Sequence, residues 1–234
     1  MKTLGFLETD TLYPDLQEDY VSYGNMFRDF FDALGASLNY RFYQVQEGEL
    51  PTAAGECDAY LITGSKAGVY EEFSWIAPLT RWLQQAYEQQ EKLIGVCFGH
   101  QLLAHALGGH AARSPKGWGI GVHTTRVLQR PMWLNDDLSH IRLIYSHRDQ
   151  VEQLPPAARC LLSSEFCENA AFYIGTQVLS FQGHPEFSVE FTERLLPRRR
   201  ECIGTKVFDE GMATLTQPTE ADIAGRWILE LINL

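Results

Sequence analysis

The chain has 234 residues, of which 45% are hydrophobic and 21% charged, a balance typical of a globular protein with a full buried core. Its 30 acidic and 19 basic residues give a formal net charge of −11, which argues against nucleic acid as a partner, because phosphate binding needs clustered Lys and Arg. No apolar run approaches the ~20 residues that span a bilayer, and an acidic surface disfavours anionic lipid. The first residues reach an acid too early for a secretory signal, so we expect a cytoplasmic protein without a membrane partner.

The cysteines are odd in number, and no two of them have the C-x-x-C spacing of a redox or zinc motif. Both a disulfide scaffold and a cysteine-based metal site are therefore disfavoured, and we expect no metal and no cofactor. One reactive cysteine among several ordinary ones is compatible with this pattern. The five are Cys57, Cys97, Cys160, Cys167 and Cys202.

The first half of the chain alternates short apolar runs with amphipathic helical patterns. This alternation indicates βαβ units and a parallel sheet. Strands are predicted at 2–8, 38–45, 58–63 and 92–96, and helices at 18–34 and 75–90.

The second half contains several strand-like runs with few helices between them, so we expect part of it to be antiparallel. No repeat or linker divides the chain, and we expect a single domain over residues 1–234. The fold class predicted is α/β, with a mostly parallel central sheet and some antiparallel strands in the second half. The later strands are predicted at 122–128, 141–146, 160–164, 171–174 and 177–182, and helices at 189–201 and 220–232.

The sharpest local feature is the Gly-x-Cys-x-Gly sequence at residues 95–99, which follows a predicted strand and opens a predicted helix. This is the pattern of a nucleophile elbow with cysteine in place of serine. The amino end of a helix favours the thiolate of Cys97, and the free N–H of Phe98 can bind an oxyanion. The alternative is a buried cysteine between two packing glycines.

His184 is the preferred partner base among the seven histidines. It follows a predicted strand, and Glu186, two residues later, lies on the same face of an extended chain, within reach of the imidazole. Pro185 fixes the φ angle between them. The alternative is a solvated strand-to-loop turn. We expect His100, three residues after Cys97, to help line the mouth of the pocket.

Four segments in this order resemble the class I (triad) glutamine amidotransferases. Residues 95–101 read Gly-Val-Cys-Phe-Gly-His-Gln, and residues 182–186 read Gln-Gly-His-Pro-Glu. Residues 61–65, Leu-Ile-Thr-Gly-Ser, resemble the strand and glycine loop that precede the nucleophile in this family. Residues 145–151, Tyr-Ser-His-Arg-Asp-Gln-Val, resemble its Ser-His-x-Asp segment. The resemblance implies a three-layer, flavodoxin-like α/β fold.

The resemblance also implies a Cys-His-Glu triad that works through a thioester. Cys97 would attack the side-chain carbonyl of a γ-glutamyl group, His184 would carry the proton to the leaving nitrogen, and Glu186 would orient His184. Backbone N–H groups of Phe98 and Ser65 would bind the oxyanion, with Gly64 shaping the loop, although Ser65 stands where the family usually has a second glycine. The amino-acid end of the substrate would be held by Gln101 and by the main chain around Ser146, His147 and Arg148.

The substrate and partners stay open at this stage. The leading interpretation is hydrolysis of a γ-glutamyl amide, with glutamine giving glutamate and ammonia. The motifs look most like stand-alone, GMP-synthase-like members, some of which are γ-glutamyl peptidases that cleave γ-glutamyl peptides or glutathione conjugates. A subunit that is silent until a separate synthetase docks is a further alternative. A non-enzymatic redox sensor or interaction protein on the same fold is a third, since an exposed reactive thiol oxidises readily.

Overall fold

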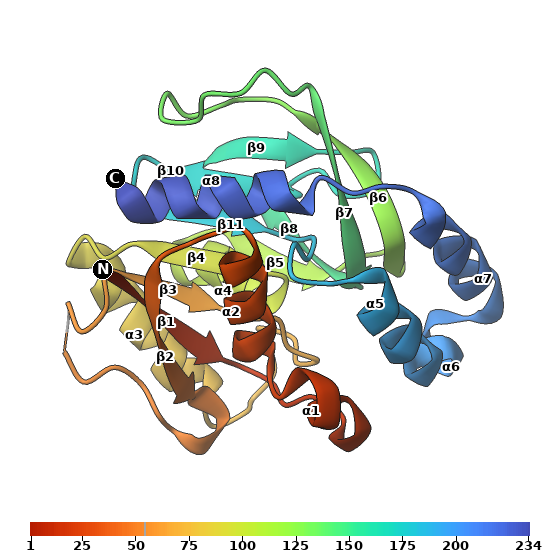
Figure 1. The fold of residues 1–234 in the computed structure, drawn as a ribbon, viewed down its shortest axis with the longest axis horizontal. Coiled ribbons are helices and arrows are strands. Elements are labelled where there is room, and N and C mark those ends of the chain that lie inside the picture. The colour runs from red at the N-terminus through yellow and green to blue at the C-terminus, as the bar shows by residue number, and fades with distance from the viewer. Residues whose placement is uncertain (54) are drawn as a thin grey trace.

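A nine-stranded mixed sheet forms the centre of the computed structural model, which describes residues 1–53 and 55–234 (Figure 1). The strand order is β2-β1-β3-β4-β11-β10-β9-β6-β7. The strands are β1 Lys2–Glu8, β2 Leu38–Gln44, β3 Ala59–Ile62, β4 Leu93–Val96, β6 Gly119–Val127, β7 His140–His147, β9 Arg159–Ser163, β10 Ala171–Ile174 and β11 Val178–Phe181.

The sheet changes character at β11. Strands β2, β1, β3, β4 and β11 are joined by four parallel pairings, and the pairings from β11 through β10, β9 and β6 to β7 are all antiparallel. The α/β fold and the antiparallel strands of the second half are thus confirmed. The sheet was expected to be mostly parallel, but it has as many antiparallel strand pairings as parallel ones.

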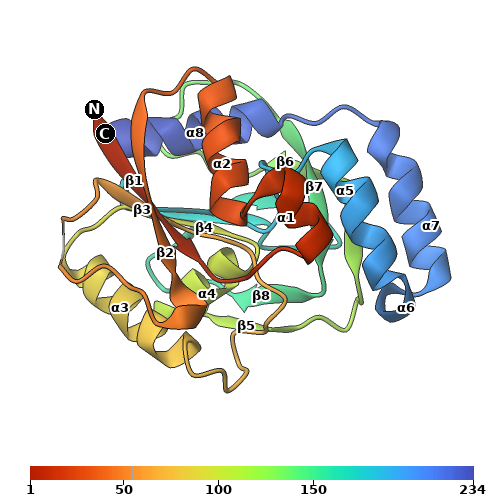
Figure 2. The ribbon, with the colours of Figure 1, turned by 60° about the horizontal axis from the view of Figure 1, so that its bottom comes forward.

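Helices cover both faces of this sheet and make three layers (Figure 2). The helices α2 and α8 pack on one face, where Phe27, Phe31 and Trp227 meet strand residues in one apolar cluster. The helices α3 and α4 pack on the other face in a second cluster. The helices are α1 Pro14–Tyr20, α2 Tyr23–Ala33, α3 Ile76–Glu88, α4 Phe98–Ala106, α5 Val189–Leu195, α6 Arg200–Ile203, α7 Thr205–Ala213 and α8 Ala221–Asn233.

The predicted helix over 18–34 is wrong, because two helices stand there. Helix α1 ends at Tyr20, and Val21 adopts a positive φ of 60°, which no helix continues through. Ser22 then begins α2 by accepting a hydrogen bond from the N–H of Asn25. The aromatic spacing runs across both helices, so periodicity alone hid the break.

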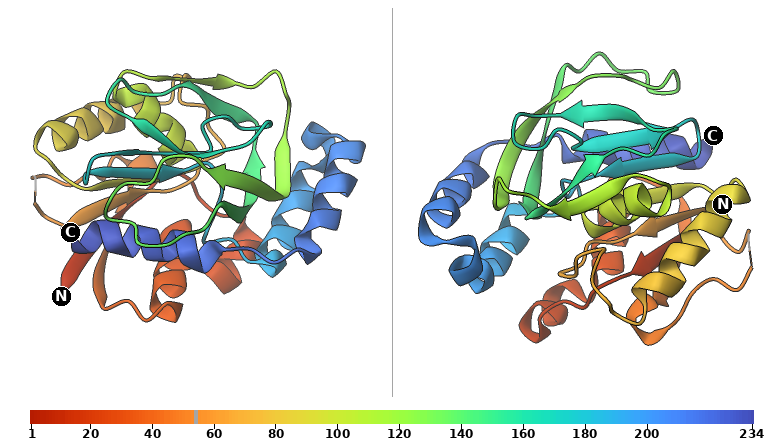
Figure 3. Two further views of the ribbon diagram at one scale, coloured as in Figure 1. Left: turned by 90° about the horizontal axis from the view of Figure 1, so that it is seen from above. Right: turned by 180° about the vertical axis from the view of Figure 1, so that it is seen from behind.

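Two short strands and one α-helix of the structure were not predicted from the sequence. The short strands β5 (His110–Arg113) and β8 (Asp149–Gln153) form a separate antiparallel pair, and their burial is too irregular to give a clear alternation. Helix α7 lies with α5 and α6 at one end of the molecule, beyond β6 and β7 (Figure 3). Within the described residues, no helix is both long and apolar enough to cross a membrane.

Candidate active site

Cys97 occupies a sharp turn between β4 and α4. Its backbone has φ 54° and ψ −104°, a strained conformation for a residue with a side chain. The turn needs both flanking glycines. A Cβ on Gly99 would lie 2.3 Å from the carbonyl oxygen of Ile62, and a Cβ on Gly95 would lie 2.5 Å from the carbonyl oxygen of Gly99. The predicted elbow is therefore present, and only glycine fits at these two positions.

Backbone hydrogen bonds tie the elbow to the strands on both sides of it. The N–H of Cys97 donates to the carbonyl of Phe181 in β11 (2.8 Å), and the N–H of Gly99 donates to that of Thr63 after β3 (3.2 Å). Phe98 is the first residue of α4, so its N–H has no acceptor within the helix. Its ring is buried against Trp75. The Phe98 N–H is thus presented next to the thiol by a rigid support.

His184 is held from three directions just after β11. Its N–H donates to the carbonyl of Ile144 in β7 (2.8 Å), which makes an isolated bridge. Its Nδ1 lies 2.7 Å from Oε1 of Glu186. Its ring stacks on that of Phe187, with 3.8 Å between centroids and 13° between planes. The predicted His184–Glu186 contact is therefore present, while Phe187 is a support that no sequence pattern singled out.

Cys97 and His184 meet over Gly64. A Cβ on Gly64 would lie 3.1 Å from Cε1 of His184 and 3.5 Å from Cβ of Cys97, so the two side chains share one small space. Burial lowers the pKa of His184, but the charge of Glu186 and the charge and hydrogen bonding of Cys97 outweigh burial and raise it above its ordinary value. This environment favours the imidazolium form of His184 at neutral pH.

The loop after β3 is fixed by the residues that follow β1. The hydroxyl of Thr9 donates to the carbonyl of Gly64 (3.1 Å), and Asp10 accepts from the N–H of Lys66 (2.8 Å). Ser65, between them, faces the cavity beside Cys97. Thr9 and Asp10 were missed by the sequence reasoning. They could have been found from their position, because they follow the carboxyl end of a neighbouring parallel strand, where functional sites of such sheets usually lie.

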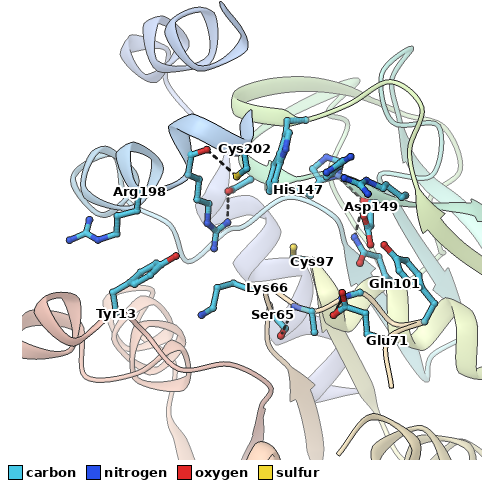
Figure 4. Close-up of a pocket in the computed structure, with 18 residues that line it drawn as sticks. Tyr13, Ser65, Lys66, Glu71, Cys97, Gln101, His147, Asp149, Arg198 and Cys202 are labelled. Atoms are coloured by element: carbon cyan, nitrogen blue, oxygen red, sulfur yellow. Dashed lines mark hydrogen bonds between the residues drawn. The ribbon is translucent and has the colours of Figure 1, made fainter. Parts of the chain in front are cut away.

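A cavity of roughly 420 Å³ opens above Cys97 (Figure 4). Six of the ten predicted site residues line it, and the other four, Gly64, Phe98, His184 and Glu186, are buried and are not part of its lining. The cavity is lined by Tyr13, Ser65, Lys66, Ala67, Gly68, Tyr70, Glu71, Cys97, Gln101, Arg113, Trp118, Ser146, His147, Arg148, Asp149, Arg198, Arg199 and Cys202.

The polar wall of this cavity is built around the backbone of Asp149. Nε2 of Gln101 donates to the carbonyl of Asp149 (2.8 Å) and to Oε1 of Gln182 (3.0 Å). Nδ1 of His147 donates to the same Asp149 carbonyl (2.9 Å), and burial lowers the pKa of His147 to about 3, so its ring is neutral. The hydroxyl of Ser146 accepts from Arg199 (2.9 Å). These contacts fix the wall rigidly.

The expected place of His100 at the pocket mouth is wrong. Its side chain is fully buried, with Nδ1 2.8 Å from the hydroxyl of Ser180 and Nε2 2.9 Å from the carbonyl of Asn169. Burial lowers the pKa of His100 to about 3. Its position on α4 turns the ring toward the sheet, where it packs on Phe172, so it supports the helix from behind. Among the described residues, no group of His, Cys, Asp and Glu side chains is arranged to hold a metal ion.

The fold and the sequence together define the class of protein. The profile of the family described as "Glutamine amidotransferase class-I" matches residues 16–199, so the chain belongs to this family of amide-hydrolysing enzymes.

The chain is also similar to individual members of this family and to solved structures. The chain is 29% identical to gamma-glutamyl peptidase 2 of Arabidopsis thaliana over 79% of this chain and 77% of that protein. It is 28% identical to gamma-glutamyl peptidase 3 of the same plant over 87% and 83% of the two chains. The crystal structure of a glutamine amidotransferase from Thermotoga maritima is similar with a TM-score of 0.76 over 99% of this chain and 96% of that one, at 18% identity, which supports the fold.

Proposed function

We propose that the protein hydrolyses γ-glutamyl amide bonds through a thioester on Cys97. The observation that carries the proposal is the buried His184–Glu186 pair, with 2.7 Å between Nδ1 and Oε1, packed with the strained Cys97 elbow around Gly64. A nucleophile, a base and a carboxylate that orients the base are the parts of a catalytic triad. A sensor cysteine has no need of such a positioned base.

The chemistry follows from the raised pKa of His184 and its place beside Cys97. The Cys97 thiolate attacks the γ-carbonyl carbon, and the carbonyl π electrons move to oxygen to give a tetrahedral oxyanion. The His184 imidazolium gives its proton to the leaving nitrogen, the C–N bond breaks and a γ-glutamyl thioester remains. His184, now neutral, takes a proton from water, which attacks the thioester and releases glutamate. The thiolate and the imidazolium are then both restored. Glu186 keeps the imidazole in one tautomer throughout.

The oxyanion would be stabilised by two backbone N–H groups. Phe98 presents the first, because it begins α4 and has no helical acceptor. Ser65 presents the second from the loop fixed by Thr9 and Asp10. Since backbone donors at a rigid support need no rearrangement in the transition state, they lower the barrier efficiently. Ser65 serves as well as glycine here, because the functional group is its N–H.

The γ-glutamyl end of the substrate would lie toward Gln101. This side chain is fixed by the Asp149 carbonyl, and the neighbouring main chain of 146–148 lines the same cavity. Backbone N–H and C=O groups at a strand end can bind an α-amino and an α-carboxylate group. The position follows the family resemblance of residues 145–151 and gives the substrate its direction across Cys97.

A γ-glutamyl peptide is the substrate class that we favour, with glutamine as the second candidate. Two relatives with more than three quarters of their length matched are named gamma-glutamyl peptidases. The cavity of roughly 420 Å³ has the size of sites that hold ligands of many atoms, and it continues past Cys97 on the side away from Gln101 (Figure 4). Ammonia as the leaving group would use little of that space. The family name itself keeps glutamine as a candidate.

Release of glutamate from purified protein tests this proposal. The substrates are γ-glutamyl dipeptides, glutathione and glutamine, each with wild type and with Cys97→Ala. We expect faster release from the peptides than from glutamine, and no release by the variant. Turnover that survives in Cys97→Ala would contradict the mechanism. Turnover of glutamine alone would retain the mechanism and contradict the favoured substrate class.

A further inference from the structure

The side chains that line the active-site cavity carry an excess of positive charge, whereas the whole chain is negatively charged. The whole chain carries a formal net charge of −11, yet its cavity is lined by five cationic side chains and two acidic ones. An excess of positive charge concentrated in one concave site favours an anionic ligand. The cations are Lys66, Arg113, Arg148, Arg198 and Arg199, and the acids are Glu71 and Asp149.

Two of these cations are already engaged by carboxylates. Nζ of Lys66 lies 2.6 Å from Oδ1 of Asp10, and the Arg198 guanidinium forms an ion pair with Asp15. Both also pack over the ring of Tyr13, with 5.2 Å from Nζ and 5.4 Å from Cζ to its centroid. Their charge is largely offset, so neither is the best candidate to bind a ligand.

Arg199 differs from these two. It is half-buried, and its NH1 donates to a neutral acceptor, the hydroxyl of Ser146 (2.9 Å). Its neighbours Arg198 and Arg200 each pair with an aspartate, whereas Arg199 forms no ion pair within the residues described. The hydroxyl holds one nitrogen of the guanidinium and leaves its charge uncompensated. The other nitrogens remain as donors for a planar anion, which a guanidinium binds with two parallel hydrogen bonds.

The cavity extends to both sides of Cys97. In Figure 4 Cys97 lies between two groups of side chains, with Gln101 and Asp149 to one side and Arg198 and Cys202 to the other. Arg199 lies between Arg198 and Cys202 in the chain, and the thiol of Cys202 donates to its carbonyl. The γ-glutamyl group is assigned to the Gln101 end and the leaving group to the opposite end. Arg199, which donates to Ser146 beside the γ-glutamyl subsite, then borders the leaving group close to the scissile bond.

We propose that Arg199 is a specificity-determining residue that binds a carboxylate on the leaving side of the scissile bond. The preferred substrate is then a γ-glutamyl amino acid or peptide whose leaving amine carries a free carboxylate. The inference rests on the proposed γ-glutamyl hydrolysis and adds the chemistry of its second subsite. The leaving group of glutamine is ammonia and has no carboxylate, so Arg199 would favour the γ-glutamyl peptide over glutamine.

The test compares γ-glutamylglycine with γ-glutamylglycinamide, which differ only in the carboxylate. We expect wild type to prefer the acid in kcat/KM by about 10-fold to 100-fold, the range of a charge-assisted hydrogen bond. In Arg199→Ala and Arg199→Gln the preference should fall to within about 2-fold of unity, because the carboxylate loses its partner. In the matched control Arg198→Ala it should remain, since Asp15 already pairs with that guanidinium.

Binding to Cys97→Ala, measured by calorimetry, gives a second readout that needs no turnover. The acid should bind more tightly than the amide, and adding Arg199→Gln should remove the difference. Equal hydrolysis of acid and amide by wild type, or a preference that persists without Arg199, would overturn the inference and leave the proposed function standing. No hydrolysis of either compound or of glutamine would overturn the proposed function itself.

Discussion

The two halves of the central sheet position the two reacting side chains by different means. The parallel half presents Cys97 through backbone geometry, with strand β4, two glycines and the amino end of α4. The antiparallel half presents His184 through side chains and a single bridge, with Glu186, Phe187 and the Ile144 carbonyl around it. The two meet where β4 pairs with β11, at the change from parallel to antiparallel. Substitutions that alter the support of Cys97 should therefore abolish activity, whereas substitutions around His184 should reduce it by degrees.

Removing the thiol should have the largest effect. Cys97→Ala deletes the only atom that forms the proposed covalent bond, and we expect kcat for γ-glutamyl hydrolysis to fall by about 10⁴-fold or more. The alanine fits the same backbone, so thermal unfolding should change little. Wild-type rates in this variant would show that the elbow is not the reaction centre.

The next effect should come from the backbone support of the elbow. In Gly99→Ala the new Cβ would lie 2.3 Å from the Ile62 carbonyl oxygen, and neither backbone can yield cheaply. We expect the free energy of unfolding in urea to drop by about 3 kcal/mol, together with loss of activity. Gly175→Ala is the control, because that position has a positive φ but open space around it, and should cost about 1 kcal/mol with activity kept. An equal loss of unfolding free energy in the two variants would contradict the claim that close packing requires glycine at position 99.

On the antiparallel side, Glu186→Gln should slow the reaction and move its pH profile. The Glu186 charge helps to raise the pKa of His184, so its removal lowers that pKa and the imidazolium is lost at lower pH. We expect kcat/KM to fall by about 10-fold to 100-fold, and its alkaline limb to shift toward lower pH. The measurement is a pH–rate profile of both proteins with one dipeptide. An unmoved or upward-shifted limb would contradict the assigned role of Glu186.

The smallest effect should come from the aromatic support of the base. Phe187→Leu keeps an apolar side chain but removes the ring that stacks on His184 at 3.8 Å, so we expect a roughly 3-fold loss of kcat with little change in KM. Phe172→Leu is the control, since that ring packs on His100 away from the reacting groups. It should lower the melting temperature similarly and leave kcat unchanged. A matching loss of kcat in the control would assign the effect to general packing.

Sequence reasoning was most successful where backbone and sequence are directly linked. Gly95 and Gly99 predicted a tight turn, and the turn is present with Cys97 at its tip. The strands of the first half were placed within one or two residues, because buried strands between helices give clear apolar runs.

The failures share a physical cause, which is contact between distant parts of the chain. Thr9 and Phe187 support the site through neighbours that only the fold brings close. His100 lies only three residues after the nucleophile in sequence, but the helix turns it toward Ser180, 80 positions later. Arg199 belongs to no motif, and it is distinguished only because Asp15 pairs with Arg198 while Arg199 contacts the neutral hydroxyl of Ser146.

The central claim is a γ-glutamyl thioester on Cys97, and acid quenching during turnover tests it most directly. Wild type and Glu186→Gln would be quenched within the steady state of a γ-glutamyl dipeptide, digested, and analysed by mass spectrometry. The account predicts one γ-glutamyl group on the peptide that contains Cys97 and none on the peptides of the other four cysteines. Turnover without an adduct at Cys97, or with the adduct at Cys202 in the same cavity, would contradict it.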